Sequence, residues 1–263
     1  MKDATCPDHA SHAIQGVSVP DFSPVVTDYW AAAFDERPLH RTDHVTVTVN
    51  PDSAADARVA VLRTAEDDRV SIAVTPAIAE ALAKDIAPLD NPTEADLRAA
   101  FANYGVTLNG ADNVFYLTET AADDILGDIE STNVRQLTDA DAGIFASFKA
   151  VVSEEDWNGA YVELDHWAAF GAFDERGALV SIGSMYPWDD EFPLADIGVL
   201  TLSPARGRGH AKTLVRAMFR YALTQGFEPQ YRCQPDNSAS VKLAVGLDLE
   251  LFGQWEIAVP DDE

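Results

Sequence analysis

The chain has 263 residues, of which 47% are hydrophobic, which suffices for a buried core and for two small domains. Acidic residues outnumber basic ones by 44 to 18, and the resulting net charge of −26 argues against general affinity for nucleic acid or anionic membranes. No run of about 18 apolar residues is present to cross a membrane, and two cysteines cannot build a disulfide framework.

The first 20 residues carry Asp3, Asp8 and two histidines and lack an apolar h-region, so they do not predict a secretory signal. We therefore expect a cytoplasmic protein. The acidic excess is typical of proteins from salt-adapted organisms, in which salt screens the self-repulsion of such a surface. We favour this halophile-like interpretation over the alternative, an acidic surface that binds a substrate.

The first half of the chain predicts a small α/β unit preceded by a turn-rich tail. Strict alternation in His44–Asn50 is typical of a half-buried strand, and Pro76 stands at the favoured first position of a helix. The acidic segment 119–131 lacks aromatic residues and is the predicted linker. Helices are predicted near 29–34 and over 76–87 and 94–104, and strands over 44–50, 58–63, 70–74 and 113–117.

The second half predicts a second unit in which strands and helices alternate without strict βαβ regularity. This pattern favours an α+β fold with a mixed sheet over a doubly wound fold. We place the domains at 1–130 and 131–263. Strands are predicted over 133–137, 167–173, 179–186, 196–202, 230–234 and 251–259, and helices over 138–149, 210–225 and 238–247.

One segment, 202–211 (LSPARGRGHA), carries a strong signal because it joins a predicted strand to a predicted amphipathic helix. A glycine-rich turn at that junction leaves several backbone N–H groups without partners, and with the helix dipole these bind anions such as phosphate. Gly207 and Gly209 permit unusual dihedral angles and a close approach of the ligand. Ala211 is small enough to leave that approach open.

The local charge supports an anionic ligand independently. No Asp or Glu occurs over 197–227, where average acidity would place about five. The alternative is an ordinary helix whose basic face pairs with acidic surface elsewhere. Neither a P-loop nor a GxGxxG turn with a partner acid is present. The window holds five of the 18 basic residues, namely Arg206, Arg208, Lys212, Arg216 and Arg220.

The R-x-x-G-x-A pattern of 206–211 resembles the acyl-CoA-binding signature of the GNAT N-acetyltransferases. Segment 237–244 (NSASVKLA) is similar to the family's next helix, although Asp248-Leu249 stands where the family usually has Gly-Phe. The resemblance covers about 133–259 and implies a mixed, mostly antiparallel sheet flanked by helices. It also implies direct transfer of an acetyl group from acetyl-CoA to an amine, without an acyl-enzyme.

The resemblance further implies which residues contact acetyl-CoA. The backbone around 208–211 would bind the pyrophosphate, splayed strands 196–202 and 230–234 would hold the pantetheine, and backbone N–H near Leu200 or Thr201 would stabilise the oxyanion. Asn237 would be a polar contact at the thioester. The expected cofactor-binding residues are Leu200, Thr201, Leu202, Arg206, Gly207, Arg208, Gly209, His210, Ala211, Asn237 and Ser240.

Proton chemistry requires a base, because only a neutral amine attacks a thioester. Asp196 lies near where the family often places an acidic base, and a strand-end carboxylate without a catalytic role is the alternative. The loop acids 189–191 are further candidates. The position of the family's general-acid tyrosine is Ala244, so another group does this work or the thiolate leaves unaided. Cys233 is expected to be a buried small hydrophobe rather than a nucleophile.

Two further features of the sequence give weaker indications of function. The spacing Cys6-x-x-His9-x-x-His12 lacks a fourth ligand nearby, so we expect no metal. An aromatic and acidic cluster around Trp157 and Tyr186 is expected to be core or rim, and a part that lined the acceptor site would suit a cationic or aromatic amine. Three functions stay open: an N-acetyltransferase acting on a small molecule, a non-catalytic acyl-CoA sensor, and transfer to protein amines. The sequence leaves a homodimer open as well.

Overall fold

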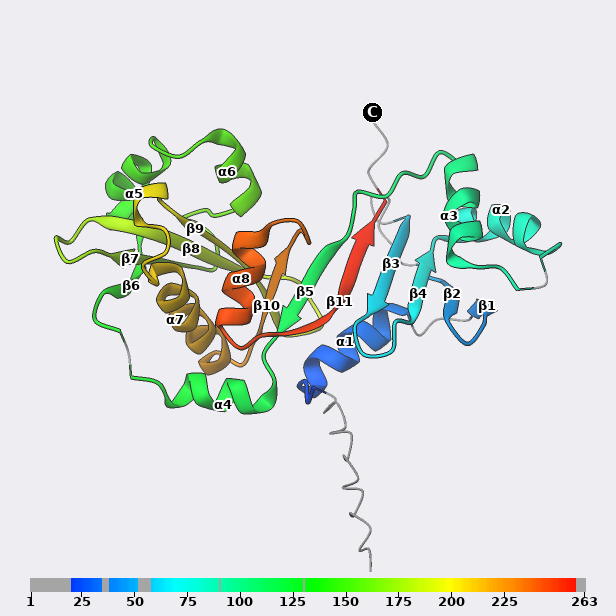
Figure 1. Cartoon of the computed structure of the whole chain (residues 1–263), viewed down its shortest axis with the longest axis horizontal. Helices are drawn as coiled ribbons and strands as arrows, with labels where there is room; N and C mark the ends of the chain where they lie inside the picture. Colours follow the sequence, from blue (N-terminus) through cyan, green and yellow to red (C-terminus); the bar gives the residue numbers. More distant parts are fainter. Residues whose placement is uncertain (1–19, 35–37, 52–57, 90, 130, 259–263) are drawn as a thin grey trace, which may run out of the picture.

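The computed structural model describes residues 20–34, 38–51, 58–89, 91–129 and 131–258. These residues form one eleven-stranded sheet with helices on both faces (Figure 1). The strand order is β1-β2-β4-β3-β11-β5-β10-β9-β8-β7-β6, and neighbours are antiparallel except for β2–β4 and β9–β10. The predicted fold class, a mixed and mostly antiparallel sheet flanked by helices, is confirmed.

The elements of the first half follow the predicted order. They are α1 (Pro24–Phe34), β1 (Pro38–Arg41), β2 (Val45–Val49), β3 (Val59–Thr64), β4 (Val70–Val74), α2 (Pro76–Ile86), α3 (Glu94–Asn103), β5 (Asp112–Tyr116) and α4 (Glu119–Gly127).

The second half begins with β6 and ends with β11. Its elements are β6 (Val134–Leu137), the 3-10 turn η2 (Asp139–Asp141), α5 (Ala142–Lys149), α6 (Glu154–Ala160), β7 (Ala168–Phe173), β8 (Leu179–Pro187), β9 (Leu194–Thr201), η3 (Ser203–Ala205), α7 (His210–Thr224), β10 (Glu228–Cys233), α8 (Ser238–Gly246) and β11 (Glu250–Ile257).

Segment 119–131 was predicted as a linker, and that prediction is wrong for its larger part. Residues Glu119–Gly127 form α4, which begins at the Thr118 cap and buries Ile125 against α7. The acidic positions of α4 are simply its exposed face. Two short elements, β1 and α6, were not predicted, because four to seven residues are too few to show a period.

Two strands join the halves of the chain. β5 of the first half lies between β10 and β11 of the second half, and β11 in turn pairs with β3. The strands of the two halves therefore form one continuous sheet (Figure 1). The close approach of β11 to β3 depends on Gly253, where an added Cβ would overlap the carbonyl oxygen of Arg63.

We expect Gly253→Ala to lower the free energy of unfolding by about 1–3 kcal/mol, because backbone must move to admit the methyl group. Denaturant unfolding measures this. Gly246→Ala is the matched control, since its Cβ meets nothing within 4 Å in helix α8, and it should be neutral or stabilising by up to about 1 kcal/mol. Equal stability of the two variants would contradict a tight β3–β11 junction.

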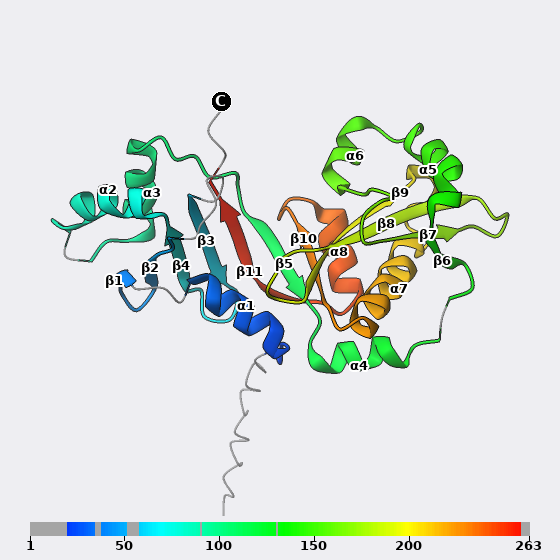
Figure 2. The same ribbon diagram turned by 180° about the vertical axis from the view of Figure 1, so that it is seen from behind.

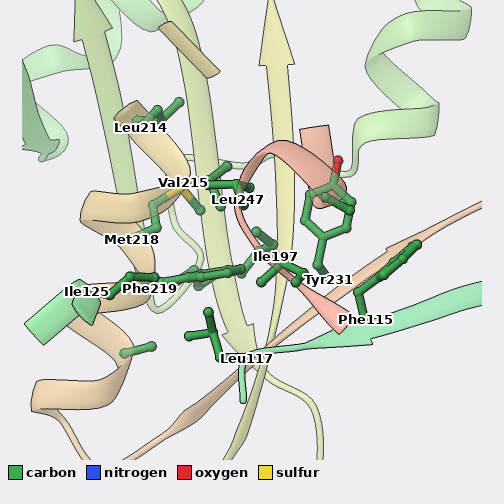
Figure 3. Close-up of a cluster of buried hydrophobic side chains, with 14 of the residues drawn as sticks. Phe115, Leu117, Ile125, Ile197, Leu214, Val215, Met218, Phe219, Tyr231 and Leu247 are labelled. Carbon is green, nitrogen blue, oxygen red and sulfur yellow. The ribbon is translucent and has the colours of Figure 1, made fainter. Parts of the chain in front are cut away.

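Successive side chains along the strands of the second half point to opposite faces of the sheet, and both faces carry apolar side chains. In β7, Ala168 and Phe170 join a cluster under α7, while Ala169 joins a cluster under α5 and α6. Helix α7 directs Leu214, Val215, Met218 and Phe219 into the first cluster, toward Ile197 of β9 and Tyr231 of β10 (Figure 3).

The first half has its own two-sided core. Valines of β2, β3 and β4 pack on one face against Leu82 of α2 and Phe101 of α3. Helix α1 lies on the sheet near β3 and β11 (Figure 2), where Trp30 contacts an aromatic cluster that includes Tyr116 of β5 and Phe252 of β11. Helix α1 therefore packs on the strands that join the two halves.

Candidate active site

A cavity opens where β9 and β10 separate. The two parallel strands pair only from Glu228↔Leu194 to Gln230↔Asp196, and β9 then continues to Thr201 without β10. A cavity of about 780 Å³ lies beyond this point, lined by both strands, by the start of α7 and by α8. Parting strands leave backbone N–H and C=O groups toward the cavity, which suits an extended ligand with amide groups.

The turn before α7 forms one end of the cavity. Gly207 and Gly209 have φ values of +75° and +85°, in the left-handed region that glycine favours, and an added Cβ at either would meet open space. Gly209 is the N-cap of α7, a 15-residue helix. Since the first-turn N–H groups of a helix lack partners within it, this end of the cavity favours an anion such as a phosphate.

Most of the residues expected to contact the ligand lie together around this cavity. Leu202 and Arg208 do not line it, and Leu202 borders instead a smaller apolar groove beside α5. The expected residues that line the cavity are Asp196, Leu200, Thr201, Arg206, Gly207, Gly209, His210, Ala211, Asn237 and Ser240.

The basic residues of 206–220 serve different purposes. Arg206 donates to the Thr201 carbonyl (3.0 Å) and to Asp156 (3.1 Å), which fixes the turn. Arg216 and Arg220 bind the Asp128 segment at the end of α4. The basic face of α7 therefore pairs in part with acidic surface, which was the alternative weighed for this helix.

Helix α8 closes another side of the cavity. The Asn237 side-chain oxygen accepts from the Ser240 backbone N–H (3.1 Å) and so caps the helix. Ala244 is buried and carries no acid. Tyr231 of β10 directs its hydroxyl toward α8, 3.4 Å from the Ser240 carbonyl oxygen (Figure 3), and burial raises its pKa to about 12. Its phenol is therefore protonated at neutral pH.

Asp196 lies at the point where the strands part and is 4% exposed. Its Oδ1 accepts from Gln230 Nε2 (3.1 Å) and Arg232 Nε (3.1 Å), and its Oδ2 accepts from Arg232 Nη2 (2.8 Å) and the Tyr186 hydroxyl (2.9 Å). Both oxygens are thus fully engaged. Of these partners, Tyr186 and Arg232 line the cavity.

Arg232 is the cationic centre of this network. Burial alone would lower its pKa, but the charge and hydrogen bonds of Asp196 outweigh burial and hold that pKa above its ordinary value. Arg232 also lies over the rings of Trp188 (4.2 Å) and Trp255 (5.5 Å) and forms a 3.4 Å ion pair with Asp112. The guanidinium is therefore held in place from several sides.

Tyr186 reaches the cavity from β8. Burial and the neighbouring Asp196 raise the pKa of its phenol, which keeps the hydroxyl protonated and donating. Its ring lies 5.4 Å from the ring of Tyr161 and 5.0 Å from that of His166. Of the predicted aromatic cluster, Tyr161 and Tyr186 line the cavity, whereas Trp157 of α6 is buried in the cluster that includes Phe145 of α5.

Sequence reasoning missed Gln230 and Arg232 as partners of Asp196. Polar residues alternate along β10 at Glu228, Gln230 and Arg232, and that alternation was a usable signal. The loop acids expected as alternative bases do not line the cavity; Asp189 caps its own turn by accepting from the backbone of Glu191 and Phe192.

Cys233 offers a probe of the cavity, which it lines while only 8% exposed. Burial raises the pKa of its thiol to about 11, so the reactive thiolate is scarce at neutral pH. In a Cys6→Ser background we expect slow alkylation by iodoacetamide at pH 7.5 and faster alkylation at pH 9.5. Coenzyme A should slow the reaction at both pH values, and mass spectrometry of the labelled peptide measures it. Labelling that coenzyme A leaves unchanged would place the ligand elsewhere.

Residues 134–246 match the family model described as "Acetyltransferase (GNAT) family". The C-terminal half of this chain is a GNAT domain. The match begins at β6 and ends with α8, so it contains the glycine turn, both parting strands and Asp196. Apart from Asp112, every residue that lines the cavity lies in the matched region.

Solved structures of low identity resemble the chain. A GNAT-family acetyltransferase from Colwellia psychrerythraea is 16% identical, with a TM-score of 0.49, covering 89% of this chain and 96% of that one. A putative GNAT-family acetyltransferase from Novosphingobium aromaticivorans is 15% identical, with a TM-score of 0.44, covering 60% and 69%. A comparison with curated proteins gives no match.

Among the residues that the structure describes, no group of three His, Cys, Asp or Glu side chains is arranged to hold a metal ion. The spacing Cys6–His9–His12 lies outside the described residues. None of the described helices is both long and apolar enough to cross a membrane.

Proposed function

We propose that this protein transfers the acetyl group of acetyl-CoA to a primary amine of a small molecule. The observation that carries the proposal is a single cavity with an anion site at one end and a buried carboxylate network at the other. The turn at Gly207–Gly209 and the N-terminus of α7 receive the pyrophosphate. The parting strands β9 and β10 receive the pantetheine, which brings the thioester toward Asp196.

The reaction needs an amine to attack the thioester carbonyl, so that a C–N bond forms and the C–S bond breaks. Backbone N–H near Leu200 or Thr201 stabilises the oxyanion of the tetrahedral intermediate. Because both oxygens of Asp196 are engaged, the amine proton passes to the Tyr186 hydroxyl while that hydroxyl's own proton passes to Asp196. The Tyr186 hydroxyl then gives a proton to the displaced thiolate and regains one from Asp196, which leaves an amide and coenzyme A and returns both side chains to their starting state.

Tyr186→Phe tests the route through the hydroxyl. We expect kcat to fall about 10- to 100-fold while acetyl-CoA affinity changes little, since proton transfer is lost and the binding surface is kept. Tyr161→Phe is the control, because its ring contacts that of Tyr186 but no hydrogen bond joins it to Asp196 among the described contacts. An equal loss of kcat in both variants would mean that the aromatic surface contributes to turnover and that proton transfer through the Tyr186 hydroxyl does not.

The overall proposal is tested by calorimetric titration of acetyl-CoA at high salt, followed by a thiol-release assay with a panel of amines. High salt screens the charge of −26 that would oppose binding of an anionic ligand. Micromolar binding with turnover of at least one amine supports the proposal. Binding without turnover, across small amines and peptides, supports the non-catalytic sensor instead. A folded protein that does not bind acetyl-CoA contradicts both.

A further inference from the structure

A buried line of hydrogen bonds connects the N-terminal helix to Asp196. Trp30 Nε1 of α1 donates to the Tyr116 hydroxyl of β5 (2.9 Å), and that hydroxyl donates to the side-chain oxygen of Gln230 on β10. The Gln230 amide nitrogen donates to Asp196 Oδ1 (3.1 Å). All four side chains are at most 4% exposed, so water does not compete for these bonds.

The chemistry of the donors fixes the direction of this line. An indole N–H can only donate, so Tyr116 accepts from Trp30 and turns its own hydrogen toward Gln230. The side-chain oxygen of Gln230 is thereby occupied, and its NH₂ group faces the carboxylate of Asp196. The obligate donor on α1 thus orients each later group, and the line ends with an N–H pointing at the anion.

The line crosses the junction between the two halves of the chain, where β5 pairs with β10. Tyr116 lies on β5, the strand of the first half that is inserted beside β10. Gln230 lies at the last paired position of β10, directly opposite Asp196 and beside the opening of the cavity. The first half of the chain therefore reaches the proposed reaction centre through buried side chains.

We propose that Trp30, Tyr116 and Gln230 are positioning residues that hold Asp196 for proton transfer, and that helix α1 is a required part of the acetyl-transfer site. This inference rests on the proposed function. A buried hydrogen bond to a charged group is stronger than one between neutral groups, and leaving its partners unpaired is costly. Without the line, Asp196 keeps Arg232 and Tyr186, but Oδ1 loses the Gln230 amide and retains only the bond from Arg232 Nε.

Tyr116→Phe is the sharpest test, because it removes one oxygen atom from the middle of the line. We expect kcat to fall about 10-fold, the size expected for a lost hydrogen bond in a charged network, with the Kd of acetyl-CoA within about 2-fold of wild type. Trp30→Phe is a second variant that leaves the hydroxyl in place, and we expect a smaller loss of kcat from it. Steady-state kinetics and calorimetry supply the two readouts.

Tyr29→Phe is the matched control. The Tyr29 hydroxyl also lies on α1 and also accepts from an indole N–H, that of Trp188 (2.7 Å), in the same aromatic cluster. No hydrogen bond leads from Tyr29 to Asp196 among the contacts of the described residues. We expect this variant to keep the wild-type kcat while its unfolding midpoint moves as that of Tyr116→Phe does.

A double-mutant cycle separates positioning from general loosening of the fold. If Tyr116 acts through Asp196, Tyr116→Phe causes no further loss of kcat in an Asp196→Asn background. Three results would overturn the inference and leave the proposed function standing. They are an undiminished kcat in Tyr116→Phe, a loss of kcat in Tyr29→Phe as large as that in Tyr116→Phe, and losses of kcat from Tyr116→Phe and Asp196→Asn that add in full. A wild-type protein that transfers no acetyl group overturns the proposed function, and this inference with it.

Discussion

Replacing Gly209 with glutamate weakens acetyl-CoA binding by about 100-fold or more, because a carboxylate then faces a pyrophosphate within a few ångströms. An added Cβ at Gly209 meets open space, so the new side chain occupies the anion site without displacing other atoms. It also brings negative charge to the N-terminus of α7, where the ligand's phosphates would otherwise be favoured. Calorimetric titration at high salt measures the change.

Gly226→Glu is the control for this experiment. Gly226 follows the other end of α7, has a nearly equal φ of +83°, and also has open space around its missing Cβ. It does not line the cavity. The two variants share the added charge and the backbone strain, so only the Gly209 variant should lose binding. Equal loss in both would show that strain or net charge, rather than a phosphate site, explains the effect.

Asp196→Asn lowers kcat by about 100-fold or more while the acetyl-CoA Kd changes by less than about 3-fold. The amide has nearly the volume of the carboxylate but cannot take up a proton from Tyr186. Asparagine is preferred to alanine because its side-chain oxygen still accepts from Arg232; either change removes the charge of the buried ion pair, at a cost of about 3–5 kcal/mol of stability. Turnover assays with a responsive amine, alongside denaturant unfolding, give both quantities.

Asp112→Asn is the matched control for Asp196. It removes the same charge from the same arginine, since Asp112 forms the other ion pair of Arg232 (3.4 Å), but it does not contact Tyr186. Burial raises the pKa of the Asp112 carboxyl, and Arg232 opposes that rise. Neutralising Asp112 is therefore a milder change than neutralising Asp196. We expect less than about 10-fold loss of kcat. Unchanged turnover in Asp196→Asn would remove Asp196 from the mechanism.

Local sequence signals found most of the elements. Three examples are the valine alternation in β2, Pro76 at the start of α2 and the capping pattern before α3. Each depends on a few neighbouring residues, so each can be recognised from the sequence alone. The acidic stretch of α4 was misleading because charge marks an exposed face as readily as a linker. Only its single buried residue, Ile125, reveals that it packs on α7.

The geometry of the turn that we propose binds the anion was predicted for the same reason. A strand, a glycine turn and a helix are consecutive, so Gly207, Gly209 and the helix N-terminus need no distant partner to form it. The partners of the basic residues could not be predicted, because Arg216 and Arg220 bind Asp128, some 90 positions away in the chain.

The sequence by itself determined the class of the fold, the glycine turn that we propose binds phosphate, and the place of Asp196 on the strand before that turn. Tertiary structure alone decided that β5 lies beside β10, that Asp196 is locked between Arg232, Tyr186 and Gln230, and that Trp30 reaches it through Tyr116. The reason is physical: helices and turns form through contacts between near neighbours, whereas strand pairing and buried polar networks join residues far apart in the chain, and their partners are chosen only when the sheet assembles.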